Sequence, residues 1–180
     1  MQSIRNFARD VRQLLKMRKE RNYKLLIIQF AVVLLLIALD QATKYWALES
    51  LKPIRVFPII EDVFNLRFAE NTGAAFSMLQ GKRVLLTVLP SAASIFMVYL
   101  LVSDKIKSKF GTWGITLVLS GAIGNLIDRA FRGKVIDMFD FELINFPVFN
   151  VADICVSVGA VLIFIYAIFF SDNKAEKKDE

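Results

Sequence analysis

The chain lacks histidine altogether and has a single cysteine, Cys155, among its 180 residues. The absence of histidine excludes Ser-His-Asp and Cys-His catalysis and histidine-ligated zinc. One cysteine allows neither an internal disulfide nor a CxxC metal site. Glycine and proline are also scarce, with 8 and 4 residues, which excludes a collagen-like or low-complexity chain. Carboxylates, lysines, hydroxyls and backbone groups are left as the available chemistry.

Long apolar segments are what the chain has in abundance. Hydrophobic residues make up 56% of it and the mean hydropathy is +0.49, which is too apolar for an ordinary soluble domain. Four runs with no charged residue approach the length of about 20 residues that crosses a bilayer, and a soluble bundle would not need them. We therefore predict an all-α integral membrane protein with four transmembrane helices, at about residues 25–46, 84–103, 110–128 and 152–171.

Basic residues gather in three of the connecting regions. Residues 1–24, the link between the second and third spans, and the C-terminal tail together hold 14 of the 23 lysines and arginines. The positive-inside rule then predicts that both termini are cytoplasmic and that the two long connections face the outside. The chain divides into a basic extension (1–24), one membrane domain (25–171) and a charged cytoplasmic tail (172–180). The extension is either an amphipathic helix on the anionic inner leaflet or a solvated tail.

The first long connection contains two segments with strand character. Residues 56–60 and 63–68 are rich in β-branched and aromatic residues, and the second segment partly alternates apolar and polar side chains. They predict a small extracytoplasmic sheet lying on the membrane. Asn71-Thr-Gly73 is a turn signal, and small residues at 73–75 let the backbone approach a ligand closely. An ordinary turn explains the same residues equally well.

Polar residues concentrate where the outer connections meet the predicted spans. At the end of the first span, Asp40 and Lys44 are four residues apart on a helix and can pair on one face. This pair is either an interfacial anchor or part of a site. At the start of the fourth span, Asn150 fits an N-cap with Asp153 three residues further on. Asp153 is either a functional carboxylate just below the interface or a charge that the helix dipole favours.

The outer end of the third span carries another polar cluster. Asn125 lies three residues before Asp128 and four before Arg129, so the three share a helix face. The glycines at positions 121 and 124 leave this face open for close packing. Asp128 and Arg129 are adjacent, so each can pair with a different partner.

Two aspartates are candidates for catalytic groups. Asp137 lies between apolar residues in the second outer connection, which indicates a partly desolvated carboxylate, and Asp153 follows 16 residues later. Because this connection starts and ends at the membrane, both can converge on one cavity just inside the outer face. Two carboxylates in one site cannot both ionise easily, so one can accept a proton from water while the other donates one. Such chemistry needs neither metal, histidine nor cysteine, although two aspartates in a loop are a weak signal by themselves.

The ordered set of motifs resembles the lipoprotein signal peptidase family, the type II signal peptidases of bacteria. The five motifs are Asp40-Gln-x-Thr-Lys44, Asn71-Thr-Gly-Ala-Ala-Phe-Ser77, Gly121-x-x-Gly-Asn-Leu-Ile-Asp-Arg129, Val135-x-Asp137 and Phe149-Asn-x-Ala-Asp153. The resemblance covers about residues 25–170 and leaves out the extension and the charged tail. It implies four transmembrane helices, both termini in the cytoplasm, and an outer β-cradle with a short helix in the outer loops.

The resemblance also implies an activity and roles for single residues. The family is that of membrane aspartyl endopeptidases that remove the signal peptide from diacylglyceryl-modified prolipoproteins, cutting on the N-terminal side of the lipid-modified cysteine. Asp137 and Asp153 match the catalytic pair. The positions that bind substrate or support the site are matched by Asn71, Gly73, Asn125, Arg129 and Asn150. Structural positions near the site are matched by Asp40, Lys44 and Asp128.

The location and partners follow from the same resemblance. It implies a multi-pass protein of the bacterial cytoplasmic (inner) membrane, with the active site near the outer face. We expect prolipoprotein substrates and membrane lipids as partners, and a monomer without nucleic acid, metal or cofactor. Two other classes of membrane protein are alternatives to a peptidase, namely a small transporter and a non-catalytic scaffold. A transporter would spread polar residues through the depth of several spans, and a scaffold would not need paired aspartates.

Overall fold

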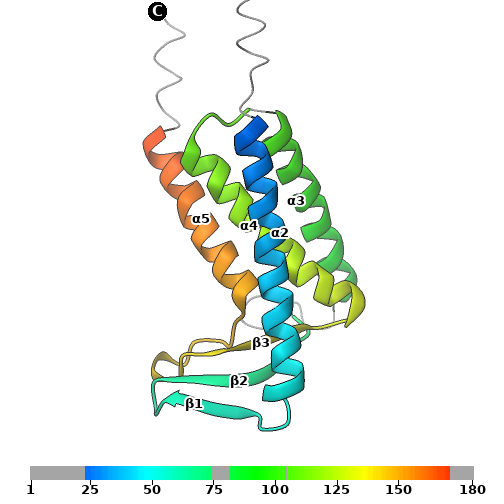
Figure 1. Cartoon of the computed structure of the whole chain (residues 1–180), viewed down its shortest axis with the longest axis vertical. Coiled ribbons are helices and arrows are strands. Elements are labelled where there is room, and N and C mark those ends of the chain that lie inside the picture. Colours follow the sequence, from blue (N-terminus) through cyan, green and yellow to red (C-terminus); the bar gives the residue numbers. More distant parts are fainter. Residues whose placement is uncertain (1–22, 74–81, 104, 171–180) are drawn as a thin grey trace, which may run out of the picture.

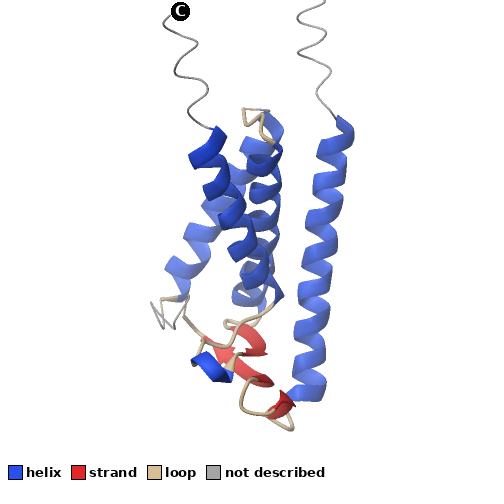
Figure 2. Ribbon diagram, turned by 90° about the vertical axis from the view of Figure 1, so that its left-hand side faces the viewer, coloured by secondary structure: helices blue, strands red, loops and turns tan. Residues whose placement is uncertain are grey.

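Four long helices form a bundle, and a three-stranded sheet lies across one end of it (Figures 1 and 2). The computed structural model describes residues 23–73, 82–103 and 105–170. The long helices of this part are α2 (Tyr23–Trp46), α3 (Arg83–Ser103), α4 (Lys109–Phe131) and α5 (Val151–Phe170). All four are long and apolar enough to cross a membrane. The predicted mostly helical membrane fold with a small sheet is therefore confirmed.

The positions of the first and last long helices agree with an even number of membrane crossings. The start of α2 and the end of α5 both lie at the end of the bundle away from the sheet (Figure 1). The tail 172–180 and all but the last two residues of the extension 1–24 lie outside the described residues. The division of the chain into extension, membrane domain and tail therefore stays a prediction.

The first helix is longer than the apolar run that predicts it. α2 continues through Asp40 and Lys44 to Trp46, and one π-helical turn, η1 (Ala47–Leu51), extends it further. The continuation of the helix past residue 39 is therefore confirmed. Asp40 and Lys44 are buried on the face of α2 that meets the bundle, whereas most apolar side chains of this helix are partly or fully exposed.

The helix α4 contacts the other three long helices and carries small residues where they come closest. A Cβ added to Gly121 would lie 2.2 Å from the carbonyl oxygen of Ala152 in α5. A Cβ added to Gly124 would lie 2.6 Å from Oδ2 of Asp40 in α2. These two glycines thus permit the close packing that was predicted for this face, and both lie at the sheet end of the bundle.

The sheet consists of β1 (Val56–Ile60), β2 (Phe64–Asn71) and β3 (Val135–Asp140), paired antiparallel in that order. β1 and β2 confirm the two predicted strands, and β2 runs further than predicted, to Asn71. The strand β3 was not predicted, because its apolar residues do not alternate with polar ones. All but one of its six residues are buried, so the period-two pattern of a half-exposed strand is absent.

Apolar contacts fix the sheet to the end of the first helix. Ala47 and Leu51 of η1 pack against Phe68, Ile136 and Met138 of the sheet, and all five are buried. Beyond β3 the chain makes the short 3₁₀ helix η3 (Glu142–Ile144) and turns back. It then forms an antiparallel bridge between positions 139 and 149, which returns the chain to the start of α5 beside β3.

The close approach of α4 and α5 predicts that a larger residue at position 121 lowers the free energy of unfolding. Gly121→Ala places a methyl group against a backbone carbonyl that cannot move without shifting α5, so we expect a loss of about 1–3 kcal/mol. For a chain of this size that is a fall of several degrees in Tm, measured by thermal unfolding in detergent. Gly111→Ala is the matched control on the same helix, because the three atoms nearest to its new methyl belong to the side chains of Ile106 and Tyr166 and not to backbone. An equal Tm for the two variants would contradict the prediction.

Candidate active site

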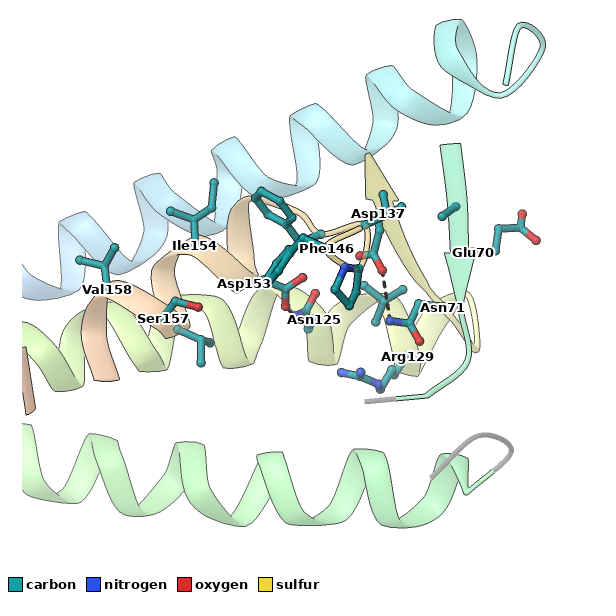
Figure 3. Close-up of a pocket in the computed structure, with 16 residues that line it drawn as sticks. Glu70, Asn71, Asn125, Arg129, Asp137, Phe146, Asp153, Ile154, Ser157 and Val158 are labelled. Carbon is teal, nitrogen blue, oxygen red and sulfur yellow. Dashed lines mark hydrogen bonds between the residues drawn. The ribbon is translucent and has the colours of Figure 1, made fainter. Parts of the chain in front are cut away.

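A cavity of about 630 Å³ opens where β2 and β3 meet α4 and α5. Figure 3 shows its lining side chains, which come from these four elements and from the loop before α5. The wall nearest the sheet is polar and includes Asn71, Asn125, Arg129, Asp137 and Asp153. The remaining wall is mainly apolar and is formed by residues 146–149 and by the first turns of α5. The cavity is therefore polar at one end and apolar at the other.

Asp137 is held in the sheet by amide groups on both of its oxygens. The register of β2 and β3 places Ala69 opposite Asp137 and Asn71 two residues further along, on the same face. From there Asn71 Nδ2 donates to Asp137 Oδ2 at 3.1 Å. Asn150 Nδ2 donates to the other oxygen, Oδ1, at 2.6 Å. The exposed fraction of Asp137 is 2%, so these two amides replace most of its hydration.

Asp153 is held by the start of α5. Its backbone N–H donates to Asn150 Oδ1 at 2.9 Å, and its carboxylate Oδ2 accepts from the backbone N–H of Asn150 at 3.2 Å. This reciprocal pair confirms Asn150 as an N-cap and is the arrangement of a capping box. The second oxygen of Asp153, Oδ1, accepts from Asn125 Nδ2 at 2.8 Å. Asn150 thus contacts both aspartates, with its side-chain N–H groups toward Asp137 and its oxygen toward Asp153.

Lys44 lies behind this polar wall and is fully buried. Its Nζ lies 2.9 Å from Asp40 Oδ2 and 3.1 Å from Asp128 Oδ2. The same Nζ donates to Asn125 Oδ1 at 2.9 Å. Because Lys44 and Asn150 both donate to this oxygen, the Asn125 amide must present its nitrogen to Asp153. The predicted pair of Asp40 and Lys44 is therefore a buried ion cluster next to the site rather than an interfacial anchor.

The two carboxylates of this cluster each bind one backbone amide. Asp40 Oδ1 accepts from the N–H of Ala152 at 2.9 Å, and Asp128 Oδ2 accepts from the N–H of Ile136 at 3.2 Å. Ala152 directly precedes Asp153, and Ile136 directly precedes Asp137. Each carboxylate of the cluster thus fixes the backbone next to one aspartate of the cavity.

Two further members of the cluster, Gln41 and Arg132, were not predicted as site residues. Arg132 donates to Asp128, and its Nη1 also donates to Gln41 Oε1 at 3.1 Å. Gln41 Nε2 donates to Asp40 and to the carbonyl of Gly124, both at 3.1 Å. The spacing of four residues between Asp128 and Arg132 on a helix is a signal that could have found this pair.

Arg129 and Gly73 meet at the edge of the cavity. Arg129 Nη2 donates to the carbonyl oxygen of Gly73 at 2.8 Å, and the N–H of Gly73 donates to Asn71 Oδ1 at 2.8 Å. The second contact is an Asx-type turn, which orients the Asn71 amide so that its nitrogen faces Asp137. The predicted turn after Asn71 is present in this form, and residues 74 and 75 lie outside the described residues.

Burial raises the pKa of Asp137 to about 6 from its ordinary value of 3.8, and the charge of Asp153 adds to this rise. The hydrogen bonds from Asn71 and Asn150 act in the opposite direction, because they stabilise the ionised form. The folded protein therefore holds a proton on Asp137 more tightly than the unfolded chain does. It follows that burying Asp137 lowers stability increasingly as the pH rises from about 4 through about 6.

All ten residues singled out from the sequence lie at the sheet end of the bundle. Two of them are the aspartates of the cavity, five hold or flank these aspartates, and three belong to the ion cluster behind them. Asn150 and Gly73 do not line the cavity and act through their neighbours. Within residues 23–73, 82–103 and 105–170, no group of three or more potential ligands is placed to hold a metal ion.

The fold and the site define a class, that of multi-pass membrane proteins with a buried polar site at one end of a four-helix bundle. The particular family follows from comparison. A family model described as "Signal peptidase (SPase) II" matches residues 32–169. The chain therefore belongs to the signal peptidase II family and is a membrane peptidase.

Individual relatives agree with this assignment. A lipoprotein signal peptidase of Clostridioides difficile is 44% identical over 142 residues, which is 79% of this chain and 95% of that protein. One from Enterococcus faecalis is 40% identical over 155 residues, or 86% and 95% of the two chains. A solved structure, described as a bacterial membrane enzyme, superimposes with a TM-score of 0.76 at 31% identity, covering 83% of this chain and 92% of the other.

The burial of the ion cluster predicts that removing its central cation lowers the free energy of unfolding. Lys44→Met leaves Asp40 and Asp128 buried without the cation between them, so we expect a loss of about 3–5 kcal/mol, measured by thermal unfolding in detergent. Lys52→Met is the control, because Lys52 is half exposed and its nitrogen lies 3.9 Å from Glu70. Such a surface pair contributes at most about 1 kcal/mol. A Lys44→Met protein as stable as the control variant would show that the cluster does not hold the fold.

Proposed function

We propose that this protein is an aspartyl endopeptidase that removes the signal peptide from diacylglyceryl-modified prolipoproteins, cutting on the N-terminal side of the lipid-modified cysteine. Asp137 and Asp153 are the catalytic pair of this proposal. The observation that carries it is that both carboxylates line one cavity and that each of their four oxygens accepts a hydrogen bond from an amide N–H. Membership of the signal peptidase II family supports the peptidase chemistry, and the names of the relatives support lipoproteins as substrates.

The neutral character of these donors suits the chemistry. A lysine or arginine bonded directly to Asp137 would lower its pKa and keep it ionised, whereas amides hold the geometry and allow a proton to stay. The pKa of Asp137, raised to about 6, is close enough to neutrality for a proton to be bound and released in each cycle. The pair then shares one proton, and that proton belongs to the pair rather than to either residue.

The reaction follows from this single shared proton. The ionised carboxylate takes a proton from a water molecule as its oxygen attacks the scissile carbonyl carbon. The protonated carboxyl group donates to the carbonyl oxygen, on which negative charge develops. When the C–N bond breaks, the pair gives a proton to the leaving amine and takes one back from a hydroxyl group of the tetrahedral intermediate, which becomes the new carboxyl group. The pair thus returns to its starting state with one proton. The products are the carboxyl end of the signal peptide and the free amine of the lipid-modified cysteine.

The remaining roles and the setting complete the proposal. Asn71, Asn125 and Asn150 orient the aspartates, and Arg129 with Gly73 forms the edge that meets the substrate backbone. Asp40, Lys44 and Asp128 support the site from behind. The protein acts as a monomer in the bacterial inner membrane, with both termini cytoplasmic and the site near the outer face. The distribution of basic residues supports this orientation, and membrane lipids surround the exposed apolar faces of the helices.

Removal of either carboxylate tests the catalytic pair. We expect Asp137→Asn and Asp153→Asn each to lower cleavage of a diacylglyceryl-modified prolipoprotein in detergent by at least about 1,000-fold, because neither variant can share and transfer the proton. Signal-peptide release is followed by gel electrophoresis. Asp62→Asn is the matched control, since Asp62 is exposed and its positive φ of 58° suits asparagine equally well. Substantial activity in either variant of the pair would overturn the assignment.

The raised pKa of Asp137 predicts a pH dependence. As the pH rises through about 6, the pair loses its shared proton, so kcat/KM should fall with an apparent pKa near that value. Asn71→Ala removes a hydrogen bond that stabilises ionised Asp137, so the pKa rises and the decline should move to higher pH. Asn65→Ala is the control from the same strand, because Asn65 donates to Glu142 and does not line the cavity. A decline that stays in place or moves to lower pH in Asn71→Ala would contradict this explanation.

A further inference from the structure

Ser157 is a polar residue in the otherwise apolar part of the cavity. It lies four residues after Asp153 on α5, so it occupies the same face of the helix one turn deeper in the bundle. Its neighbours Ile154 and Val158 also line the cavity, with exposed fractions of 43% and 48%. Figure 3 shows these residues following Asp153 along the helix. A single hydroxyl group is thus presented among aliphatic side chains.

The Ser157 hydroxyl differs from others in the helices of the bundle. The hydroxyls of Ser91, Ser94, Thr116 and Ser120 each donate to the carbonyl oxygen four residues earlier, at 2.7–2.8 Å. This is how a helix in an apolar setting satisfies a serine or threonine. The Ser157 hydroxyl makes no hydrogen bond with any residue that the structure describes. Its donor is therefore available to a molecule that enters the cavity.

Support of the aspartates does not explain this hydroxyl. Both oxygens of Asp153 already accept hydrogen bonds, from Asn125 and from the backbone of Asn150. The Ser157 side chain is exposed at the cavity, so packing within the described residues does not explain the hydroxyl either. A donor that enters an apolar environment without an acceptor costs free energy, so a ligand that supplies the acceptor gains by comparison.

We propose that Ser157 is a substrate-binding residue that donates a hydrogen bond to a carbonyl oxygen of the substrate in the apolar part of the cavity. The inference rests on the proposed function. Carbonyl oxygens are the acceptors that such a substrate brings into an apolar environment, either from the main chain of the signal peptide or from the acyl esters of the lipid. The N–H groups of a helical peptide are already bonded internally, whereas its carbonyls keep a second lone pair.

The experiment compares variants at position 157 on two substrates. One substrate is a diacylglyceryl-modified prolipoprotein peptide, and the other is its dialkylglyceryl analogue, in which ether linkages remove the ester carbonyls. With the diacyl substrate, Ser157→Ala should raise KM about 2- to 10-fold, the effect of one hydrogen bond, with kcat nearly unchanged. Ser157→Thr retains the hydroxyl and should restore the parent KM. Ser91→Ala is the control, because Ser91 lies on α3 and does not line the cavity.

The two substrates identify the source of the carbonyl. If the KM difference between the parent and Ser157→Ala disappears with the ether analogue, the ester carbonyl is the acceptor. If the difference persists, the acceptor is a carbonyl of the peptide. A Ser157→Ala protein with the parent KM on both substrates would overturn the inference while leaving the proposed function intact. A parent protein that cleaves neither substrate would overturn both.

Discussion

The buried ion cluster around Lys44 is the interaction on which the rest of the site depends. Lys44 and Arg132 bring two positive charges to two negative ones, from Asp40 and Asp128, so the cluster is neutral. Each carboxylate also accepts a hydrogen bond from the backbone N–H of a residue that directly precedes an aspartate of the cavity. The cluster thereby fixes β3 and the start of α5 relative to α2 and α4. Without Lys44, the carboxylates of Asp40 and Asp128 would be buried without the cation that lies between them.

Burial around the two aspartates suits the proposed chemistry and opposes stability. The pKa of Asp137 rises because its carboxylate has little access to water, and that rise is a cost to the folded state at neutral pH. Apolar contacts elsewhere offset the cost, including the packing of η1 on the sheet and the close contact of α4 with α5. The cations of the cluster reach the aspartates only through asparagine amides or through the backbone. Their field stabilises negative charge at the site without forming a direct salt bridge, which would hold Asp137 ionised.

Much of this arrangement could be predicted from the sequence, because local spacing encodes it. The helices follow from charge-free runs, two strands from their composition, and the Asn150 cap from its distance to Asp153. The strand β3 could not be recognised by alternation, because both of its faces are buried. The bonds from Asp40 and Asp128 to backbone N–H groups leave no trace in the side-chain pattern, since any residue offers such a donor. For the same reason the sequence indicates Gly73 only by its small size, whereas in the structure its carbonyl oxygen accepts a hydrogen bond from Arg129.

The composition of the chain and the location of the site are connected by proton chemistry. A protein without histidine must obtain proton transfer near neutral pH from groups whose ordinary pKa values are far from it. For a carboxyl group the direct route is removal of water, and the boundary between the apolar bundle and the sheet provides such an environment. The same boundary gives the cavity one polar and one apolar end. The proposed substrate has a polar part, the peptide bond to be cut, and an apolar part, the lipid next to it. The location that raises the pKa of the carboxyl group would therefore also accommodate this substrate.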